Sequence, residues 1–159
     1  MAYTQAELQA KVALGRDAIF RVAPVGENGA TPQPTAFKEL CLASEVTVGF
    51  ENKSITFANF CSGGSDVEIP VGETGTLDLS EMQWIEDDAA LLIMETAARE
   101  KGTVAYEFLP AGAGAGKTVY RGTFTVKGWK IKAAAAGTVT VDNPGLAAGG
   151  MPEKGTVSA

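Results

Sequence analysis

The feature that most constrains this fold is one helix followed directly by two strands, all within residues 86–126. Acidic residues at 86–88 open the helix, and Lys101 with Gly102 closes it. Both end-capping and the helix dipole therefore favour a helix over residues 87–101. At about 100° per residue, the apolar side chains gather on one broad face, formed by Ala90, Leu91, Ile93, Met94, Ala97 and Ala98. A helix with such a face has to pack it against another layer.

The helix leads into two segments that alternate apolar and polar residues with the period of a β-strand. These segments are 103–109 and 118–127, and the glycine-rich residues 110–117 between them predict a hairpin tip. Closing a core over the helix face and the strand faces requires a second β layer. The sequence therefore predicts a mainly β fold with a minor α+β character. We expect an antiparallel β-sandwich or open barrel flanked by one α-helix, with a long loop and extended termini.

The N-terminus predicts either a short helix or an arm that orders when it docks. Thr4 and Glu7 match a capping box, which favours a helix over residues 4–14. Leu8 and Val12 are four residues apart and would form one narrow apolar stripe. A helix of about 11 residues is marginal on its own, so both alternatives stay open.

Further strands are predicted before the central helix. Residues 17–23 alternate as a strand, which Pro24 ends. Residues 45–50 and 54–57 also alternate, and the polar residues 51–53 between them predict the turn of a β-hairpin.

A long loop is predicted over residues 59–75, which are rich in glycine and serine. Pro70 interrupts the alternating run 67–71, so this run is expected to be an edge or an isolated excursion and not a central strand. Loops of this length in a compact domain are usually functional, disordered or docked on a partner.

The chain after residue 127 predicts two further strand segments and a tail. The apolar phase shifts by one residue at Gly128, which predicts a bulge that carries the strand into residues 129–132. A last short strand is expected over residues 137–142. Residues 143–159 have almost nothing to pack and predict a flexible C-terminal tail.

Length and composition predict a single domain over residues 1–159, with an arm or short helix (1–15), a sandwich containing the helix (16–142) and the tail. The net charge is −6 and the sequence pI is about 4.7, which argues against a basic nucleic-acid-binding surface. Histidine, the commonest general base, is absent. No apolar run is long enough to cross a membrane and no secretory signal precedes the fold, so we expect a protein made in a cytoplasm without membrane insertion.

The two cysteines, Cys41 and Cys61, lack the spacing of a metal site. The favoured interpretation is two buried thiols in a reducing compartment. A disulfide between them is the alternative.

Two features suggest an enzyme, but each has a simpler explanation. Residues 111–118 look like a phosphate-binding loop, yet its first glycine is replaced by Ala111, and Thr118 opens a strand where a helix would be needed. An acidic cluster at 81–88 could hold a hard cation, yet it lacks EF-hand spacing and its later members fit a helix start. The cluster consists of Glu81, Glu86, Asp87 and Asp88. We therefore predict no catalytic, cofactor-binding or metal-binding residues, and no enzyme.

The order of elements is a strand, a hairpin, a long loop, one helix, a second hairpin and a loose tail. It resembles the tail tube proteins of long-tailed bacteriophages, which are similar to the tubes of contractile tails and type VI secretion. The resemblance rests on the helix at 87–101, the strand at 103–109, the glycine-rich tip and residues 120–129, which contain a G-x-apolar-x-apolar strand starting at Gly122. It covers roughly residues 15 to 145.

This resemblance implies a structural virion protein with no cofactor. Six copies would form a ring, one sheet of each copy would join a continuous inner β-barrel, and stacked rings would form a tube that delivers DNA into the host. The implied partners are further copies and other tail proteins such as the tape measure and terminator, with DNA only in transit. The implied location is the virion tail, assembled in the host cytoplasm. An acidic chain suits such a conduit, because it does not retain DNA through its phosphates.

Candidate contacts between subunits or rings lie in the predicted loop, the N-terminal arm and the polar side of the helix. They are Leu92, Phe60, Ser62, Asp66, Val67, Ile69, Val71, Leu8 and Val12. Leu92 lands on the polar helix face, where a neighbouring subunit could cover it, although a single exposed leucine is also normal on a monomer.

Two alternatives from other classes remain. A monomeric β-sandwich that binds a ligand or carbohydrate would show an exposed aromatic cluster near Trp84 or Trp129, although core packing is the commoner role of tryptophan. A hydrolase or nucleotide-binding enzyme would depend on Lys117.

Overall fold

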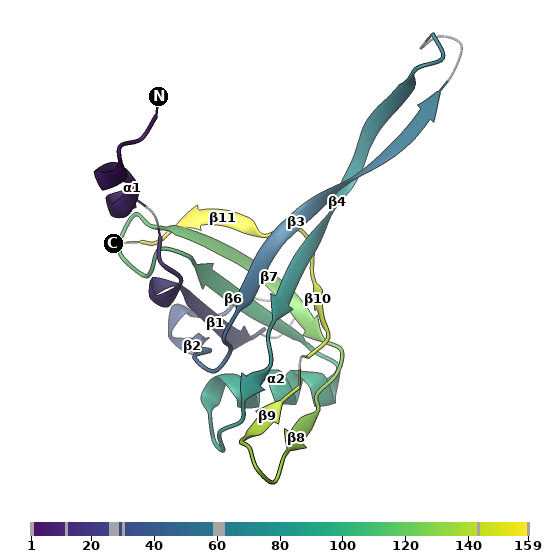
Figure 1. Ribbon diagram of the computed structural model, residues 1–159. Helices are drawn as coiled ribbons and strands as arrows, with labels where there is room; N and C mark the ends of the chain where they lie inside the picture. Colours follow the sequence, from purple (N-terminus) through teal and green to yellow (C-terminus); the bar gives the residue numbers. More distant parts are fainter. Residues whose placement is uncertain are drawn as a thin grey trace.

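The computed structural model describes residues 2–11, 13–25, 29, 31–58, 63–142 and 144–158 (Figure 1). The described helices are α1 (Gln5–Lys11), α2 (Ala89–Glu100) and the short 3₁₀ helices η1 (Gly15–Asp17) and η3 (Pro34–Ala36). The described strands are β1 (Ile19–Pro24), β2 (Lys38–Glu39), β3 (Val46–Ala58), β4 (Asp66–Leu79), β5 (Met82–Gln83), β6 (Thr103–Leu109), β7 (Thr118–Val126), β8 (Ile131–Ala133), β9 (Val139–Val141), β10 (Leu146–Ala148) and β11 (Glu153–Thr156). Their antiparallel pairing in open sheets confirms the mainly β fold class and excludes a closed barrel.

The largest sheet provides one wall of the core. Its strands follow the order β10-β7-β6-β1-β2, and β11 also pairs with β7. Helix α2 packs across β1, β6 and β7 (Figure 1). The strand alternation turns Val22, Val104, Tyr106 and Phe124 toward this helix, and none of them is more than 1% exposed. The predicted strands at 103–109 and 118–127 and the hairpin tip between them are confirmed.

Helix α2 confirms the predicted helix but begins two residues later than the predicted start at 87, because Asp88 is its N-cap. The Asp88 side chain accepts a hydrogen bond from the backbone N–H of Leu91 at 3.1 Å, which satisfies a free donor of the first turn. Lys101 adopts the left-handed conformation, with φ of 56°, and closes the last turn. The predicted apolar face is buried, whereas Leu92 is 48% exposed, as expected for its place on the polar side.

Residues 46–79 differ from the prediction. The predicted turn at residues 51–53 is wrong, because β3 continues through it without a break. The predicted loop over 59–75 is wrong from Asp66 onward, because β4 starts there and pairs with β3 along its whole length. Residues 59–62 lie outside the described residues. The result is one long two-stranded hairpin that projects from the body of the molecule (Figure 1).

A β-bulge explains how this hairpin accommodates a proline. Lys53 pairs with Gly72 and the next residue, Ser54, pairs with Pro70, so Val71 is the extra residue. Proline lacks a backbone N–H, and both strands of a two-stranded hairpin have an open edge on which that loss is tolerated. Of the two alternatives for the run around Pro70, an edge and an isolated excursion, the structure shows the edge.

The chain after β7 also departs from the prediction. The bulge at Gly128 is wrong: β7 ends at Val126, and β8 belongs to a separate three-stranded sheet of order β5-β9-β8. Trp129 lies between β7 and β8 and packs, partly buried, against the core. The last predicted strand, at 137–142, is confirmed as β9.

The C-terminal segment is paired, in contrast to the loose tail expected from its composition. Strand β10 pairs with residues 124–126 of β7, and β11 pairs with residues 118–121. The backbone N–H of Gly149 donates to the Thr123 carbonyl at 2.7 Å and connects these two pairings. The open edge of β7 thus supplies backbone partners to a segment with few side chains to bury.

The N-terminal capping box forms as predicted. The backbone N–H of Thr4 donates to Glu7 Oε2 at 2.8 Å, and the backbone N–H of Glu7 donates to Thr4 Oγ1 at 3.3 Å. The pKa of the Glu7 carboxyl is lowered first by the bond from the Thr4 backbone N–H, and then by a hydrogen bond that Thr4 Oγ1 donates to Glu7 Oε2 at 2.9 Å. Helix α1 stands away from the body (Figure 1), and Leu8 on it is 44% exposed.

Cys41 is an exposed free thiol, so the expectation that it is buried is wrong. Cys61 lies outside the described residues. Within the part of the chain that the structure describes, no helix is long and apolar enough to cross a membrane.

Candidate functional site

The distal half of the β3–β4 hairpin carries an exposed apolar face. Ile55 pairs with Ile69 and Phe57 pairs with Val67, so the four side chains lie on one side of the two strands. Ile55, Phe57 and Ile69 are 53%, 39% and 42% exposed. We call these four residues the hairpin patch.

The apolar face of the hairpin changes sides between its two halves. In the proximal half, Val46 and Val48 pair with Leu79 and Leu77, and these side chains pack against the core. They occupy even positions of β3, whereas the hairpin patch occupies odd positions of the same strand, on the opposite side. The hairpin patch therefore cannot be a continuation of the surface that covers this chain's own core.

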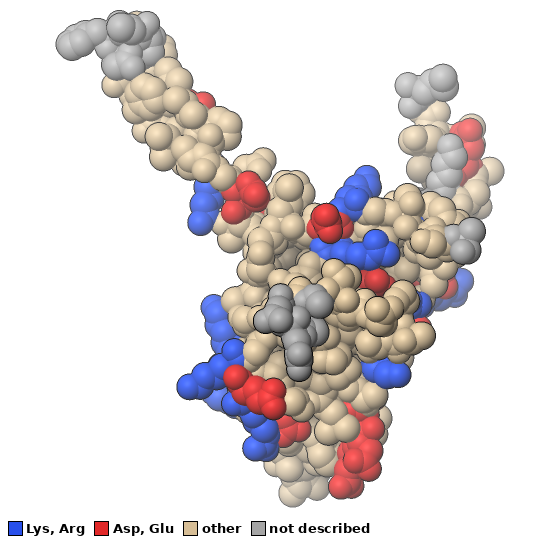
Figure 2. All heavy atoms as spheres, turned by 180° about the vertical axis from the view of Figure 1, so that it is seen from behind, with Lys and Arg blue, Asp and Glu red and all other residues tan. Residues whose placement is uncertain are grey.

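The other side of the distal half is polar. Thr56 pairs with Glu68, and Ser54 Oγ donates a hydrogen bond to Glu68 Oε1. Asp66 pairs with Ala58 on the same side. The distal hairpin is thus amphipathic, a pattern that normally has one face covered and one in water. Figure 2 shows the hairpin from behind, rising at the upper left with mostly uncharged atoms on its surface.

The structure brings together only some of the predicted contact residues. Val67 and Ile69 join the hairpin patch; Asp66 lies on the polar side of the same hairpin, and Val71 lies at the bulge and is 56% exposed. Leu8 on α1 and Leu92 on α2 lie on other elements. Phe60, Ser62 and Val12 lie outside the described residues.

Sequence reasoning missed two members of the hairpin patch, Ile55 and Phe57. Their alternation was visible, but the predicted turn at residues 51–53 placed them on a short strand of the sandwich. The signal that could have found them is the matching alternation of residues 67 and 69, which predicts two apolar pairs when the strands are aligned.

A groove of about 570 Å³ runs along the outer side of α2. Leu92, Thr96 and Glu100 follow each other at four-residue spacing and form one border of the groove. Val25 and Pro24 border it from the end of β1. We call this surface the α2 groove. Glu100 is the one charged side chain among its described lining residues.

The face of the large sheet opposite α2 carries a ladder of alternating charges. Arg21 lies 3.9 Å from both Glu39 and Glu107, and Arg121 Nε donates to Glu107 Oε1 at 3.1 Å. Glu153 is the register partner of Arg121 on the next strand. Charges of opposite sign therefore face each other across β2, β1, β6, β7 and β11, an arrangement that favours this register.

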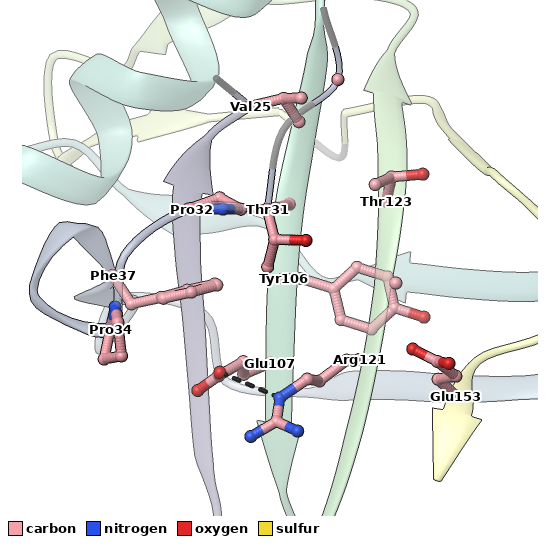
Figure 3. Close-up of a pocket in the computed structure, with 13 residues that line it drawn as sticks. Val25, Thr31, Pro32, Pro34, Phe37, Tyr106, Glu107, Arg121, Thr123 and Glu153 are labelled. Atoms are coloured by element: carbon pink, nitrogen blue, oxygen red, sulfur yellow. Dashed lines mark hydrogen bonds and ion pairs between the residues drawn. The ribbon is translucent and has the colours of Figure 1, made fainter. Parts of the chain in front are cut away.

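A second hollow, of about 480 Å³, lies over this ladder (Figure 3). The Glu107–Arg121 ion pair lies on one side of it, and Pro32, Pro34 and Phe37 lie on the other. The opposite charges of Glu107 and Arg121 neutralise each other, so this hollow offers little electrostatic attraction to a charged ligand. Figure 2 likewise shows positive and negative side chains interspersed over this side of the molecule.

Neither sequence feature that suggested an enzyme forms a catalytic arrangement. Residues 110–117 join β6 to β7, and Thr118 opens a strand with no helix N-terminus to hold a phosphate. Asp88 of the acidic cluster caps α2, and Asp87 precedes it in a left-handed conformation, with φ of 62°. Among the described residues no group of three or more cysteine, aspartate or glutamate side chains could hold a metal ion.

Both tryptophans pack against the core, in partly buried positions. This is the commoner arrangement considered for Trp84 and Trp129, and it does not form the exposed aromatic cluster expected of a carbohydrate-binding module.

No protein-family model and no curated protein matches this sequence, but solved structures do. The chain is similar to one in the tail of an empty GTA particle with C6 symmetry. The TM-score is 0.66, the sequence identity is 10%, and the match covers 89% of this chain and 98% of that chain. It is also similar to the SPP1 tail tube, with a TM-score of 0.70 and 11% sequence identity. This match covers 93% of this chain and 81% of that chain. A chain in the virion of the native gene transfer agent (GTA) particle matches with TM-score 0.65 and 9% identity over 91% and 99%. At the level of fold, the predicted resemblance to tail tube proteins is confirmed.

Proposed function

We propose that this protein is a structural subunit that self-assembles into stacked rings of six copies, which form a tail tube for DNA delivery into a host. It would reside in the virion tail after assembly in the host cytoplasm. The fold shared with the SPP1 tail tube and with a C6-symmetric GTA tail supports this assignment. The observation that carries it is the hairpin patch, an apolar face that the described residues of this chain leave exposed.

The hairpin patch is suited to contact with another copy. A two-stranded hairpin is marginally stable in water when nothing packs on it. Covering its apolar face stabilises both the hairpin and the complex, because apolar surface leaves water. A projecting element that docks on a different surface of the next copy makes a head-to-tail contact, and such contacts close into rings when the rotation between copies permits it.

The charge of the chain fits a conduit. A net charge of −6 makes the assembled tube repel the phosphate backbone, so DNA would pass without being retained by ion pairing. The role needs no catalytic residue and no cofactor. At the tube ends, we expect contacts with other tail proteins such as a tape measure and a terminator.

Light scattering over a concentration series tests the proposal. The wild-type protein should exceed the 16.4 kDa monomer mass and reach ring and tube masses as concentration rises. Phe57→Asp, on the hairpin patch, should raise the concentration needed for assembly about tenfold or more, as expected for a buried aromatic anchor. Thr56→Lys, which introduces a charge one residue away on the polar side, opposite Glu68, is the matched control and should assemble like the wild type. A monomer at every concentration would contradict the proposal and favour a monomeric ligand-binding module.

A further inference from the structure

We propose that the α2 groove receives the distal hairpin of a second copy, with Lys53 of one copy paired to Glu100 of the next. This inference rests on the proposed self-assembly and assigns the surface that the hairpin patch contacts. Its occupant is a copy of this chain because the groove matches the hairpin in chemistry, charge and spacing.

The α2 groove has the chemistry that the hairpin patch requires. Leu92 is 48% exposed at its border, and Ile93, Ala97 and Val25 add further apolar side chains to its lining. The rest of α2 buries its apolar face against the core, so Leu92 is the apolar side chain that the helix leaves in water. A second apolar surface from a neighbouring copy would cover it.

The charged side chain nearest to the hairpin patch on its side of the hairpin is Lys53, and the charged side chain of the α2 groove is Glu100, so the two charges are opposite. Lys53 occupies an odd position of β3 and lies on the same side of the hairpin as Ile55 and Phe57. Glu100 lies at the far end of the groove from Leu92. Neither Lys53 nor Glu100 forms an ion pair with a described residue of its own chain. A contact between copies would therefore give both charges a partner.

The position of Glu100 has no explanation in the stability of its own helix. It occupies the last turn of α2, where the helix dipole disfavours a negative side chain. Pairing across an interface supplies a reason for a carboxylate at this position.

The distance between the charged residue and the apolar residue is nearly the same on the two surfaces. From Lys53 to Phe57 is four residues of strand, or about 13 Å at a rise of about 3.3 Å per residue. From Leu92 to Glu100 is eight residues of helix, or about 12 Å at about 1.5 Å per residue. Placing Lys53 beside Glu100 therefore places Phe57 beside Leu92, so the ion pair and the apolar contact form together.

A charge exchange tests the pairing. Lys53→Glu and Glu100→Lys should each raise the concentration needed for assembly about threefold to tenfold, because each places like charges together. The double variant Lys53→Glu with Glu100→Lys should restore assembly to within about twofold of the wild type. The matched control is Lys38→Glu with Glu100→Lys, which has the same net charge as the double variant but should stay impaired.

Cross-linking gives a second readout that does not depend on charge. Phe57→Cys with Leu92→Cys, in a background of Cys41→Ser and Cys61→Ser, should form disulfides between copies when assembled protein is oxidised. Thr56→Cys with Leu92→Cys is the control and should not cross-link, because residue 56 faces the other side of the hairpin. Ladders of covalent oligomers for the first pair alone would support the assignment.

These experiments distinguish failure of the groove assignment from failure of the proposed self-assembly. If the wild type forms tubes but the charge exchange gives no recovery and the Phe57–Leu92 pair gives no cross-link, the groove assignment is wrong and the tube proposal stands. If the wild type forms no oligomer, both are wrong.

Discussion

The backbone of Gly75 on β4 lies directly against the backbone of Gly150, in the crossing between β10 and β11. A Cβ atom at Gly75 would clash with the Gly150 carbonyl group. Strand β4 also packs beside β10, so this contact joins the hairpin to the paired C-terminal segment. The hairpin therefore leaves the body at an angle that the C-terminal strands help to fix.

Replacing Gly75 tests this contact. Gly75→Ala should lower the free energy of unfolding by about 1 to 3 kcal/mol, because the added methyl group forces backbone movement. Gly49→Ala on the same hairpin is the matched control, since its Cβ would meet nothing within 4 Å, and should change stability by about 0.5 kcal/mol or less. Urea unfolding measures both. Equal effects of the two variants would contradict the close approach of Gly75 and Gly150.

The helix cap at Asp88 gives a second prediction. Asp88→Ala removes the bond to the Leu91 N–H and should lower the free energy of unfolding by about 1 kcal/mol. Glu86→Ala, a nearby acidic residue that does not cap the helix, should have a smaller effect. Thermal unfolding monitored by far-UV circular dichroism distinguishes them; an equal loss for both would mean that general acidity, and not the cap, matters.

Tyr106 gives a prediction for alkaline pH. Burial raises the pKa of the Tyr106 phenol above its usual value of 10.0, because the charged form is poorly solvated in the core. The contribution of the neutral phenol is fully present below pH 10 and is lost as pH rises toward the raised pKa, because only the unfolded state ionises readily there. The free energy of unfolding should therefore fall above about pH 10.

Comparison of two tyrosine variants isolates this effect. Tyr106→Phe should flatten the loss of stability above about pH 10 relative to the wild type. Tyr3→Phe, which alters an exposed ring, should leave the loss as it is. Urea unfolding at pH 8 and above measures the difference; identical pH profiles for wild type and Tyr106→Phe would show that Tyr106 does not titrate as described.

Hydrogen exchange should report the covering of the hairpin patch. In the unassembled protein, amides near residues 55–57 and 67–69 should exchange quickly, because the distal hairpin has no second layer. After assembly their exchange should slow about tenfold or more, whereas amides at 46–48, already packed on the core, should change little. No change at the distal residues in assembled protein would mean that another surface makes the contact.

Local signals predicted the central elements. The helix at 89–100 follows from its caps and its apolar face, and β6 and β7 follow from strict alternation. Residues 110–117 were predicted to be a hairpin tip because Thr118 opens a strand and not a helix. In each of these, the residues that define the element also stabilise it, so the sequence pattern was sufficient.

The long hairpin could not be predicted in this way. Residues 51–53 are polar because both faces of the hairpin meet water there, and polarity alone cannot distinguish a turn from an exposed strand. Pro70 argued against a strand, and only the alignment with Ser54 shows the bulge that accommodates it. Strands β10 and β11 depend on the open edge of β7, a tertiary feature with no local signal. Ile55 and Phe57 of the hairpin patch were missed because the polar residues 51–53 were interpreted as a turn.

The most direct test of the central claim is negative-stain electron microscopy of the purified protein over a concentration series. Self-assembly through the hairpin predicts rings or tubes of uniform diameter with a central hole, which become more numerous as concentration rises. Isolated particles of monomer size at every concentration, with no rings or tubes, would contradict it.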